Sequence, residues 1–382
     1  MIQYSDLVAS GGVGTTNHPN PRRTYPYAIR LRAPLRLRPL LTNACHGLPP
    51  PLDRPNVVLC GYGRAALSEG LRALNLSEGD NVLVPSLLCA SVLAPFKRQS
   101  IDVRFYELDQ SLGSDLSDAA QKVDSRTRGF LAVNYFGFPQ NYENIAAFCA
   151  ERNLYLIEDN AHGFLSAQRG QCLGTFGDIS IFSMRKTLGV PNGAALVINN
   201  GSLTVRSREC GFHERPHNLL KFFVEIALEQ IGYRIGVELV TPLRRWHKRL
   251  SMRRGYDEVQ ETDTETFNHC AEKWSRFSDR LIRRFPFENA RETRRGVFCK
   301  WQEWFKRADV PGVRPLFTEL PEGVVPLVFP VVGERCHVVH AQLRSRNIEA
   351  GVWPTPPARP RNLCSGILVL PVHTMPSFLV DY

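Results

Sequence analysis

The sequence predicts an α/β protein with a mostly parallel sheet and a smaller α+β domain towards its C-terminal end. Its 382 residues, 43% hydrophobic and 22% charged, suit one large core with an attached second domain and exclude wholesale disorder. From Asn56 to about Asn200, short apolar runs alternate with helical stretches, as in crossover connections between parallel strands. After Asn200 this alternation stops, which indicates a change of architecture.

Three segments follow from these changes of pattern. Residues 1–55 are rich in proline and arginine and show little periodicity, so we interpret them as an extended N-terminal arm. Residues 56–254 are expected to form the large domain, with a helical insertion from about residue 205. Residues 255–382 are expected to form the smaller C-terminal α+β domain.

Each expected strand of the large domain is a short apolar run, and each expected helix fits between two such runs. The strands are expected at 81–85, 103–107, 129–133, 155–158, 179–183 and 195–198. The helices are expected at 63–74, 91–99, 116–120 and 142–152. Further on, we expect helical regions at 219–250 and 272–306, a strand at 324–332, a helix at 337–346 and a strand at 366–370.

The net charge of +10 rests mostly on arginine, because only eight of the 47 basic residues are lysines. Such a charge is typical of proteins that contact nucleic acid, an anionic membrane or a phosphorylated small molecule. No zinc-finger, ribonucleoprotein or basic-zipper pattern is present, so nucleic acid is not expected as a partner. Ten cysteines without a CxxC pair, and an opening segment without an apolar core, favour the reducing cytoplasm.

The stretch 219–250 has two interpretations. Its broad apolar face, followed by the basic cluster 244–249, would suit a helix that lies on a membrane surface. The same pattern suits a core or dimer-packing helix with a solvated basic end, which we favour. No apolar run reaches the roughly 18 to 20 residues of a membrane span. Peripheral membrane contact through 219–250 therefore stays open.

Two polar residues stand at the ends of neighbouring expected strands. Asp159 ends the strand that begins at Tyr155, and Lys186 follows 27 residues later, after the next strand. Because the carboxyl ends of strands line the ligand crevice of an open α/β sheet, these two side chains are placed to share one site. A lysine that forms a Schiff base and an aspartate that partners the pyridine nitrogen suit pyridoxal phosphate chemistry.

Two further features fit a phosphate. Ser183 stands three residues before Lys186, and Gly63 opens an expected helix whose N-terminus favours an anion. Taken alone, Asp159 and Gly63 each have a more ordinary interpretation. An aspartate at a strand end is more often a helix cap or an ion-pair partner, and a glycine at a helix start is a common helix boundary. Two histidine pairs, 213/217 and 337/340, have ligand-like spacing but lack a completing set, so no metal site is expected.

Taken together, the motifs resemble the DegT/StrS-type sugar aminotransferases, which belong to the fold type I (aspartate aminotransferase) superfamily of pyridoxal phosphate enzymes. Seven motifs carry the resemblance in the family's order. They are Gly63–Leu67, Gly79–Ser86, Asn134–Gly137, Ile157–His162, Gly174–Asp178, Phe182–Lys186 and Leu370–His373. The resemblance implies a mostly parallel seven-stranded sheet flanked by helices, with a smaller C-terminal α+β domain.

The resemblance also implies the role of several residues. Lys186 matches the Schiff-base lysine and Asp159 the partner of the pyridine nitrogen. Ser183, with the backbone of Gly63, Arg64 and Ala65, matches the phosphate cradle.

Two positions depart from the family's usual residues. His162 stands where the family usually has a glutamine beside the cofactor's phenolic oxygen, and an imidazole N–H could donate the same hydrogen bond. A plain packed histidine is the alternative reading. Cys89 stands where an aromatic ring commonly stacks on the cofactor.

The resemblance implies transfer of an amino group, from L-glutamate, to a keto-sugar that is expected to be nucleotide-linked, in polysaccharide or secondary-metabolite biosynthesis. It implies a homodimer, although the family segment that reaches the partner's active site has only a loose echo at Gly211–Arg215. Two alternatives remain: a sugar lyase or dehydratase, and a non-catalytic membrane-associated partner that keeps the fold. Dehydratases of the family replace the lysine by histidine, so Lys186 argues against the first.

Overall fold

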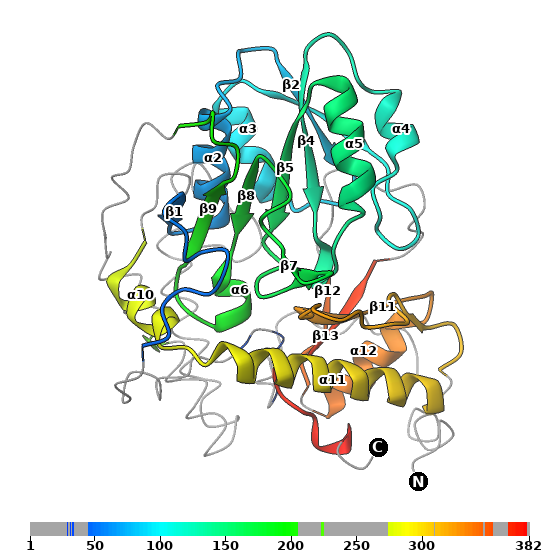
Figure 1. Ribbon diagram of the computed structural model, residues 1–382. Coiled ribbons are helices and arrows are strands. Elements are labelled where there is room, and N and C mark those ends of the chain that lie inside the picture. The colour runs from blue at the N-terminus through cyan, green and yellow to red at the C-terminus, as the bar shows by residue number, and fades with distance from the viewer. Residues whose placement is uncertain are drawn as a thin grey trace, which may run out of the picture.

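The computed structural model describes residues 29, 31, 33, 45–204, 223–224, 274–308, 310–346, 348–353 and 366–379. They form a large sheet with helices on both faces and, below it in Figure 1, a smaller antiparallel sheet beside two helices. The expected α/β class with a mostly parallel seven-stranded sheet is confirmed. Within these ranges, no helix has the length and apolar character needed to cross a membrane.

The large sheet has the strand order β1-β9-β8-β5-β4-β2-β3. Its strands are β1 (Val57–Cys60), β2 (Asn81–Pro85), β3 (Asp102–Tyr106), β4 (Thr127–Val133), β5 (Tyr155–Asn160), β8 (Ile179–Phe182) and β9 (Ala194–Ile198). Strand β9 runs antiparallel to both of its neighbours, and the other pairs are parallel. The six predicted strands are present within two residues at each end. Strand β1 was missed because it is a four-residue edge strand whose first three residues are only partly buried.

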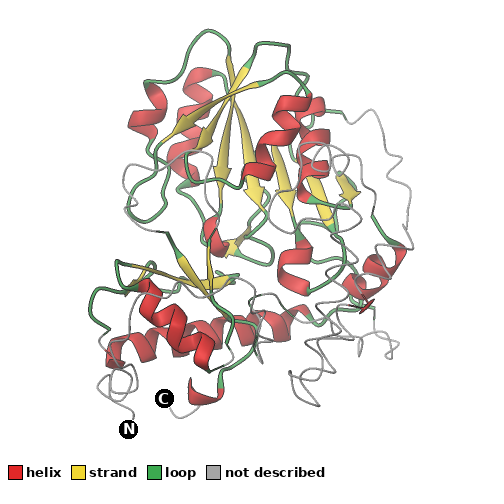
Figure 2. Ribbon diagram, turned by 180° about the vertical axis from the view of Figure 1, so that it is seen from behind, coloured by secondary structure: helices red, strands yellow, loops and turns green. Residues whose placement is uncertain are grey.

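Helices α2 and α3 cover one face of this sheet and α5 covers the other (Figures 1 and 2). The helices of this part are α2 (Gly63–Ala73), α3 (Leu93–Arg98), α4 (Leu116–Ala120), α5 (Tyr142–Arg152) and α6 (Met184–Leu188). Local chemistry sets the ends of α5: the Asn141 side chain accepts a hydrogen bond from the N–H of Asn144, and Asn153 ends the helix in the left-handed region at φ 58°. The helix predicted from residue 91 begins as a 3-10 turn, Ala90–Val92, before α3.

The alternation of side chains along β5 sends its two acidic residues to opposite faces of the sheet. In the register of the sheet, Asp159 lies beside Ile181 of β8. A Cβ atom on Gly63, the first residue of α2, would lie 4.0 Å from the Ile181 side chain. Asp159 therefore shares the sheet face that α2 covers, and Glu158 lies on the face that α5 covers.

The C-terminal part contains a four-stranded antiparallel sheet with the order β10-β11-β13-β12. Its elements are α10 (Arg276–Arg283), α11 (Phe287–Ala308), β10 (Arg314–Pro315), β11 (Val328–Val332), α12 (Cys336–Ser345), β12 (Gly351–Val352) and β13 (Leu368–Pro371). The single helical region expected at 272–306 is two helices, because Pro286 lacks the N–H that a continuous helix would need and instead precedes α11.

The strand expected from residue 324 begins four residues later. The segment before β11 finds partners outside the sheet: the N–H of Val325 donates to the Ser166 hydroxyl (2.9 Å), and the N–H of Leu327 donates to the Phe136 carbonyl (2.8 Å). These bonds attach residues 324–327 to the part of the chain that contains the large sheet.

Few residues of the expected N-terminal arm are described. The carbonyl of Ile29 accepts a hydrogen bond from the N–H of Glu349 (2.8 Å), and the N–H of Leu31 donates to the Glu349 carboxylate (2.8 Å). The helical stretch 219–250, its basic cluster and the echo at Gly211–Arg215 lie outside the described residues, apart from two helical residues at 223–224.

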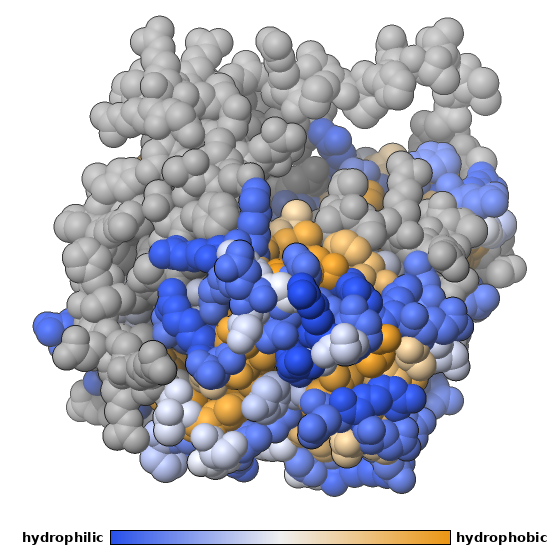
Figure 3. Space-filling model, turned by 90° about the horizontal axis from the view of Figure 1, so that it is seen from above, coloured by the Kyte–Doolittle hydropathy of each residue, from blue (hydrophilic) through white to orange (hydrophobic). Residues whose placement is uncertain are grey.

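The described apolar side chains are mostly inside. Among them, the only large ones with high exposure are Phe223, Val352 and Met375. Figure 3, seen from the top of Figure 1, shows mainly hydrophilic residues around small hydrophobic patches on the described surface. This end of the large sheet, opposite the C-terminal part, is therefore polar.

Candidate active site

Short helix α6 carries Lys186 at the carboxyl end of β8, on the side of the large sheet that faces α11 (Figure 1). Asp159, near the end of the adjacent strand β5, is 7% exposed, and its carboxylate accepts a hydrogen bond from the N–H of Ala161 (2.8 Å). Adjacent parallel strands thus bring the predicted aspartate and lysine to one edge of the sheet.

Asp159 and Lys186 influence each other's ionisation. Burial raises the pKa of the Asp159 carboxyl, and the Lys186 ammonium opposes this rise. The Lys186 side chain keeps contact with solvent, but its dense surroundings lower its pKa, with Asp159 opposing. The lowered pKa increases the fraction of Lys186 that is a neutral amine near neutral pH.

Cys89 and Arg185 also act on Lys186. Through its charged form, Cys89 raises the pKa of Lys186, and the neighbouring guanidinium of Arg185 lowers it. The Cys89 sulfur lies 3.1 Å from the Ser91 hydroxyl. The structure therefore brings Cys89 into the surroundings of Lys186, together with Asp159.

The N-terminus of α2 lies against Ser183. A Cβ atom on Gly63 would lie 3.7 Å from the Ser183 Cβ. Ser183 is 5% exposed and precedes α6, and within the described residues no side-chain hydrogen bond caps either α2 or α6. A helix N-terminus beside a serine hydroxyl is a donor set that suits phosphate.

Two guanidinium groups meet beside this helix end. The Arg64 and Arg185 guanidinium carbons lie 5.5 and 4.9 Å from the centre of the Tyr62 ring. The N–H of Ala65, predicted as part of the phosphate cradle, donates to the Tyr62 carbonyl (2.9 Å). The positive charge near the start of α2 thus comes from Arg64 of α2 itself and from Arg185 of α6.

His162 is buried beside Asp159 and Lys186, and it is 4% exposed. Its Nδ1 accepts a hydrogen bond from the N–H of Phe136 (3.3 Å), which places the proton of the neutral ring on Nε2. Its ring stacks on that of Phe136, with centroids 5.6 Å apart, and meets the edge of Trp353 at 5.1 Å. Burial, and next the charge of Lys186, hold the pKa of His162 well below its usual range.

His162 is expected to make the folded protein sensitive to mild acid. Because its pKa is lowered from 6.5 by folding, the unfolded chain binds a proton that the folded chain does not. Its contribution to stability is therefore full above pH 6.5 and is lost as the pH falls towards the folded pKa. Within that window each pH unit is expected to lower the free energy of unfolding by about 1.4 kcal/mol.

Urea unfolding at a series of pH values measures this loss. His162→Gln removes the titrating ring and is expected to flatten the pH dependence by the same amount. His337→Gln, which removes an exposed histidine of α12, is the control and should leave the dependence as in the parent protein. An equal slope in the His162→Gln and parent proteins would contradict the prediction.

Glu158 is the organising residue that the sequence analysis missed. Its fully buried carboxylate accepts hydrogen bonds from the N–H groups of Gly174 (2.6 Å), Phe176 (3.1 Å) and Gly177 (3.3 Å). The Ser180 hydroxyl (3.1 Å) and the Asn134 amide (3.3 Å) also donate to it. Burial raises the pKa of Glu158, and these donors oppose that rise. The period of two along β5 could have identified it, since it sends Glu158 to the face opposite Asp159.

Two residues of the C-terminal part also lie near the site and were not singled out. Trp353 follows β12 and contacts His162, Phe136 and Tyr135 with its ring. Arg294 of α11 donates a hydrogen bond to the carbonyl of Thr187, the residue after Lys186. Neither belongs to a recognised motif, so only the folded structure associates them with Lys186.

Comparisons with known proteins show similarity in sequence and in fold. Residues 52–235 match the model of the DegT/DnrJ/EryC1/StrS aminotransferase family. GDP-perosamine synthase of Escherichia coli O157:H7 is 36% identical over 144 residues, which are 37% of this chain and 40% of that protein. A dTDP-4-dehydro-2,3,6-trideoxy-D-glucose 4-aminotransferase of Saccharopolyspora spinosa is 31% identical over 165 residues, 42% of this chain and 43% of that protein. The chain thus aligns with about two fifths of the length of these relatives.

The fold extends further than the sequence similarity. Helicobacter pylori PseC, an aminotransferase involved in the biosynthesis of pseudoaminic acid, superposes with a TM-score of 0.61 over 85% of this chain and 84% of its own, at 15% identity. The aminotransferase TlmJ of Streptoalloteichus hindustanus gives a TM-score of 0.56 over 85% of this chain and 83% of its own, at 18% identity. At these identities the likeness shows a shared fold.

Proposed function

Because residues 52–235 of this chain match the model of the DegT/DnrJ/EryC1/StrS aminotransferase family, we propose that the protein is a member of this family and a pyridoxal-phosphate-dependent aminotransferase. The amino donor is L-glutamate, and the acceptor is a keto-sugar carried on a nucleotide. The enzyme serves polysaccharide or secondary-metabolite biosynthesis. The observation that carries the proposal is the placement of Asp159 near the end of β5 and of Lys186 just after the adjacent parallel strand β8; the direction of their pKa shifts agrees with it. The names of the two relatives each contain a nucleotide-linked sugar, and this supports the proposed substrate class.

Pyridoxal phosphate would supply an electron-accepting ring that carries the amino group between donor and acceptor. The first turn of α2 and the Ser183 hydroxyl would bind its phosphate, with Arg64 and Arg185 adding positive charge. Asp159 would hold a proton on the ring nitrogen, Nε2 of His162 would donate to the phenolic oxygen, and Cys89 would pack on the ring.

Lys186 has two tasks in this proposal. As a neutral amine it would bind the cofactor's aldehyde carbon, and once released it would move the proton from the donor's α-carbon. The lowered pKa of Lys186 supports both tasks, because each needs an unprotonated amine. The protonated ring nitrogen would be a cationic partner for Asp159. This partner would offset the cost of burying the Asp159 charge, so the carboxylate would stay ionised.

The test has three steps. Borohydride treatment of the protein with pyridoxal phosphate should attach the cofactor to Lys186, as peptide mapping by mass spectrometry would show. In a separate sample that holds pyridoxal phosphate and has not been reduced, addition of L-glutamate should yield one equivalent of 2-oxoglutarate. A panel of nucleotide-linked keto-sugars should identify the acceptor by its gain of an amino group. No attachment at Lys186 would refute the proposal, and consumption of a sugar without a gain of nitrogen would favour the dehydratase alternative.

We further propose a cytoplasmic homodimer, divided into an arm at 1–55, a large domain at 56–254 and a small domain at 255–382. The small antiparallel sheet and helices α10, α11 and α12, all of which follow residue 273, support a second domain. Sedimentation analysis of the purified protein should give twice the 43.1 kDa chain mass, and a strict monomer would contradict the dimer.

A further inference from the structure

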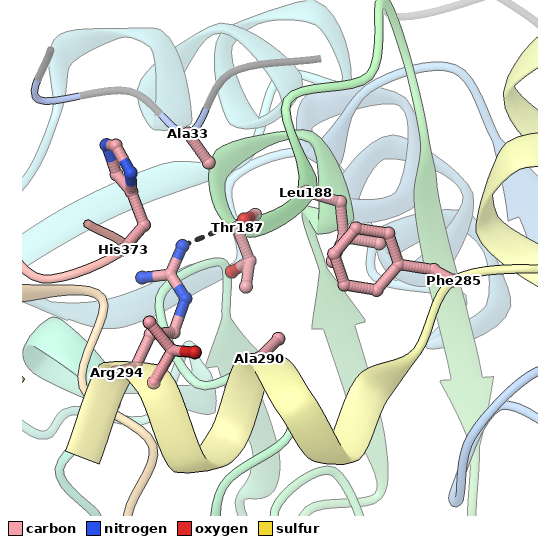
Figure 4. Close-up of a pocket in the computed structure, with 8 residues that line it drawn as sticks. Ala33, Thr187, Leu188, Phe285, Ala290, Arg294 and His373 are labelled. Carbon is pink, nitrogen blue, oxygen red and sulfur yellow. Dashed lines mark hydrogen bonds between the residues drawn. The ribbon is translucent and has the colours of Figure 1, made fainter. Parts of the chain in front are cut away.

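Arg294 connects helix α11 to the segment that carries Lys186. Its side chain is buried, with 2% of the residue exposed, although it carries a charge. Nη2 donates a hydrogen bond to the Thr187 carbonyl (2.8 Å), and Nη1 donates to the carbonyls of Leu327 (2.9 Å) and Pro326 (3.2 Å). Figure 4 shows the guanidinium reaching up from α11 towards Thr187, with His373 on one side of it and Leu188 on the other.

Helix α6, which Arg294 contacts, is too short to be stabilised by its internal hydrogen bonds alone. Helix α6 has only five residues, so most of its carbonyls have no partner within the helix. Thr187 lies in its last turn, and Gly189 ends it in the left-handed region at φ 61°. A guanidinium at this end donates to a carbonyl of the last turn and complements the negative end of the helix dipole.

Backbone bonds within the large domain hold the start of α6. The N–H of Lys186 donates to the Ser183 carbonyl (3.2 Å), and the N–H of Arg185 donates to the Gly193 carbonyl (3.3 Å). The first bond is at the upper end of the usual N–H···O range and the second is just beyond it. The shorter, charged bond from Arg294 adds a restraint at the other end of α6, beside the burial of Met184 and Leu188.

The same guanidinium fixes α6 relative to the C-terminal part of the chain. Residues 326–327 precede β11, and the N–H of Leu327 donates to the Phe136 carbonyl (2.8 Å) next to the ring stacked on His162. Arg294 thus joins α11, α6 and the 326–327 segment. Thr187, Leu188, Ala290, Arg294 and His373 also line one small pocket at this junction.

We propose that Arg294 is a positioning residue for Lys186, which it acts on by holding the Thr187 carbonyl and so fixing the direction of α6. The inference rests on the proposed function, because it concerns the lysine to which that function assigns the cofactor. Loss of the guanidinium lets α6 turn, so the amine of Lys186 leaves the dense surroundings that lower its pKa. The smaller effect of Asp159, which raises this pKa, weakens at the same time, so the net change is upward. The reactivity of Lys186 then approaches that of an ordinary lysine.

The test is competitive labelling of lysines in the cofactor-free protein with acetic anhydride over a range of pH, read by mass spectrometry of the Lys186 peptide. In the parent protein Lys186 is expected to react at lower pH than exposed Lys97. In Arg294→Gln its labelling midpoint should move up by about half a pH unit or more. Arg294→Lys keeps the charge but cannot reach three carbonyls, and it should shift the midpoint less.

Arg295→Gln is the matched control. Arg295 is the next residue of α11 and donates to the carbonyls of Pro321 (2.9 Å) and Val324 (2.6 Å), but its described bonds do not reach α6. This variant should keep the parent midpoint while losing a similar number of bonds. Circular dichroism verifies that each variant is folded, and Arg294→Lys serves if Arg294→Gln is not.

Two results would overturn the inference: parent-like midpoints in the folded Arg294 variants, or an equal shift in Arg295→Gln. Labelling needs no cofactor, so its outcome is separate from that of the borohydride experiment. A shift without attachment of pyridoxal phosphate would refute the proposed function and keep the role of Arg294. Attachment of pyridoxal phosphate to Lys186 without a shift of the labelling midpoint would support the proposed function and refute the role of Arg294.

Discussion

Lys186→Ala is expected to slow amino transfer from L-glutamate by about 10²- to 10⁴-fold or more, because proton transfer by a positioned side chain contributes about that much. The variant also lacks the amine that would bind the cofactor. Stopped assays of 2-oxoglutarate formation measure the rate, and urea unfolding should give a stability close to that of the parent protein, since the Lys186 side chain is exposed.

Lys97→Ala, at an exposed lysine of α3, is the control and should keep the parent rate. Added ethylamine provides a second check, since a small amine that enters the site of Lys186→Ala should restore part of the lost proton transfer. A Lys186→Ala protein that keeps more than a tenth of the parent rate would refute the assigned role.

Glu158→Ala is expected to be the most destabilising single change in the large domain. It leaves the buried backbone N–H groups of Gly174 and Gly177, and the part-buried N–H of Phe176, without their acceptor. An unsatisfied buried donor costs about 1 to 3 kcal/mol, so a loss of about 4 kcal/mol or more is expected from a total stability of about 5 to 15 kcal/mol. Urea unfolding measures the loss.

Glu151→Ala is the matched control for Glu158→Ala. Its carboxylate, 69% exposed on α5, pairs only with Arg152 among the described residues, and such surface pairs contribute about 0 to 1 kcal/mol. Glu158→Gln keeps the shape but turns an N–H₂ group towards some of the donors, so its loss should lie between the other two. A Glu158→Ala loss below about 1 kcal/mol would show that water replaces the carboxylate.

The sequence was sufficient for six of the seven strands of the large sheet, because most of them are buried apolar runs separated by turn residues. Asp159 and Lys186 could be paired because strand ends of a parallel sheet lie side by side. The period of two along β5 indicates only which face Glu158 is on, and its role depends on three N–H groups in the loop that follows. A motif shows which residue types are present, but not which donors the folded loop turns towards them.

The C-terminal contribution to the site was less predictable still. Arg294 lies 108 residues after Lys186, and its partners are backbone carbonyls, which carry no side-chain signature in a sequence. Trp353 reaches His162 by tertiary packing alone. The strand β1 was missed for a different reason: it is a short edge strand whose first three residues are only partly buried.

The contact between the arm and the C-terminal part has a consequence for the order of folding. Leu31 and the Glu349 carboxylate that it contacts are 318 positions apart in the chain. At a synthesis rate of about 5 to 20 residues per second, the early segment leaves the ribosome about 15 to 60 s before its partner is made. The large sheet can complete its strand pairs without the arm, because all seven strands lie between residues 57 and 198. Pairing of Ile29 and Leu31 with Glu349 is therefore among the last steps of folding, because it must wait for a segment that is made after the large sheet is complete.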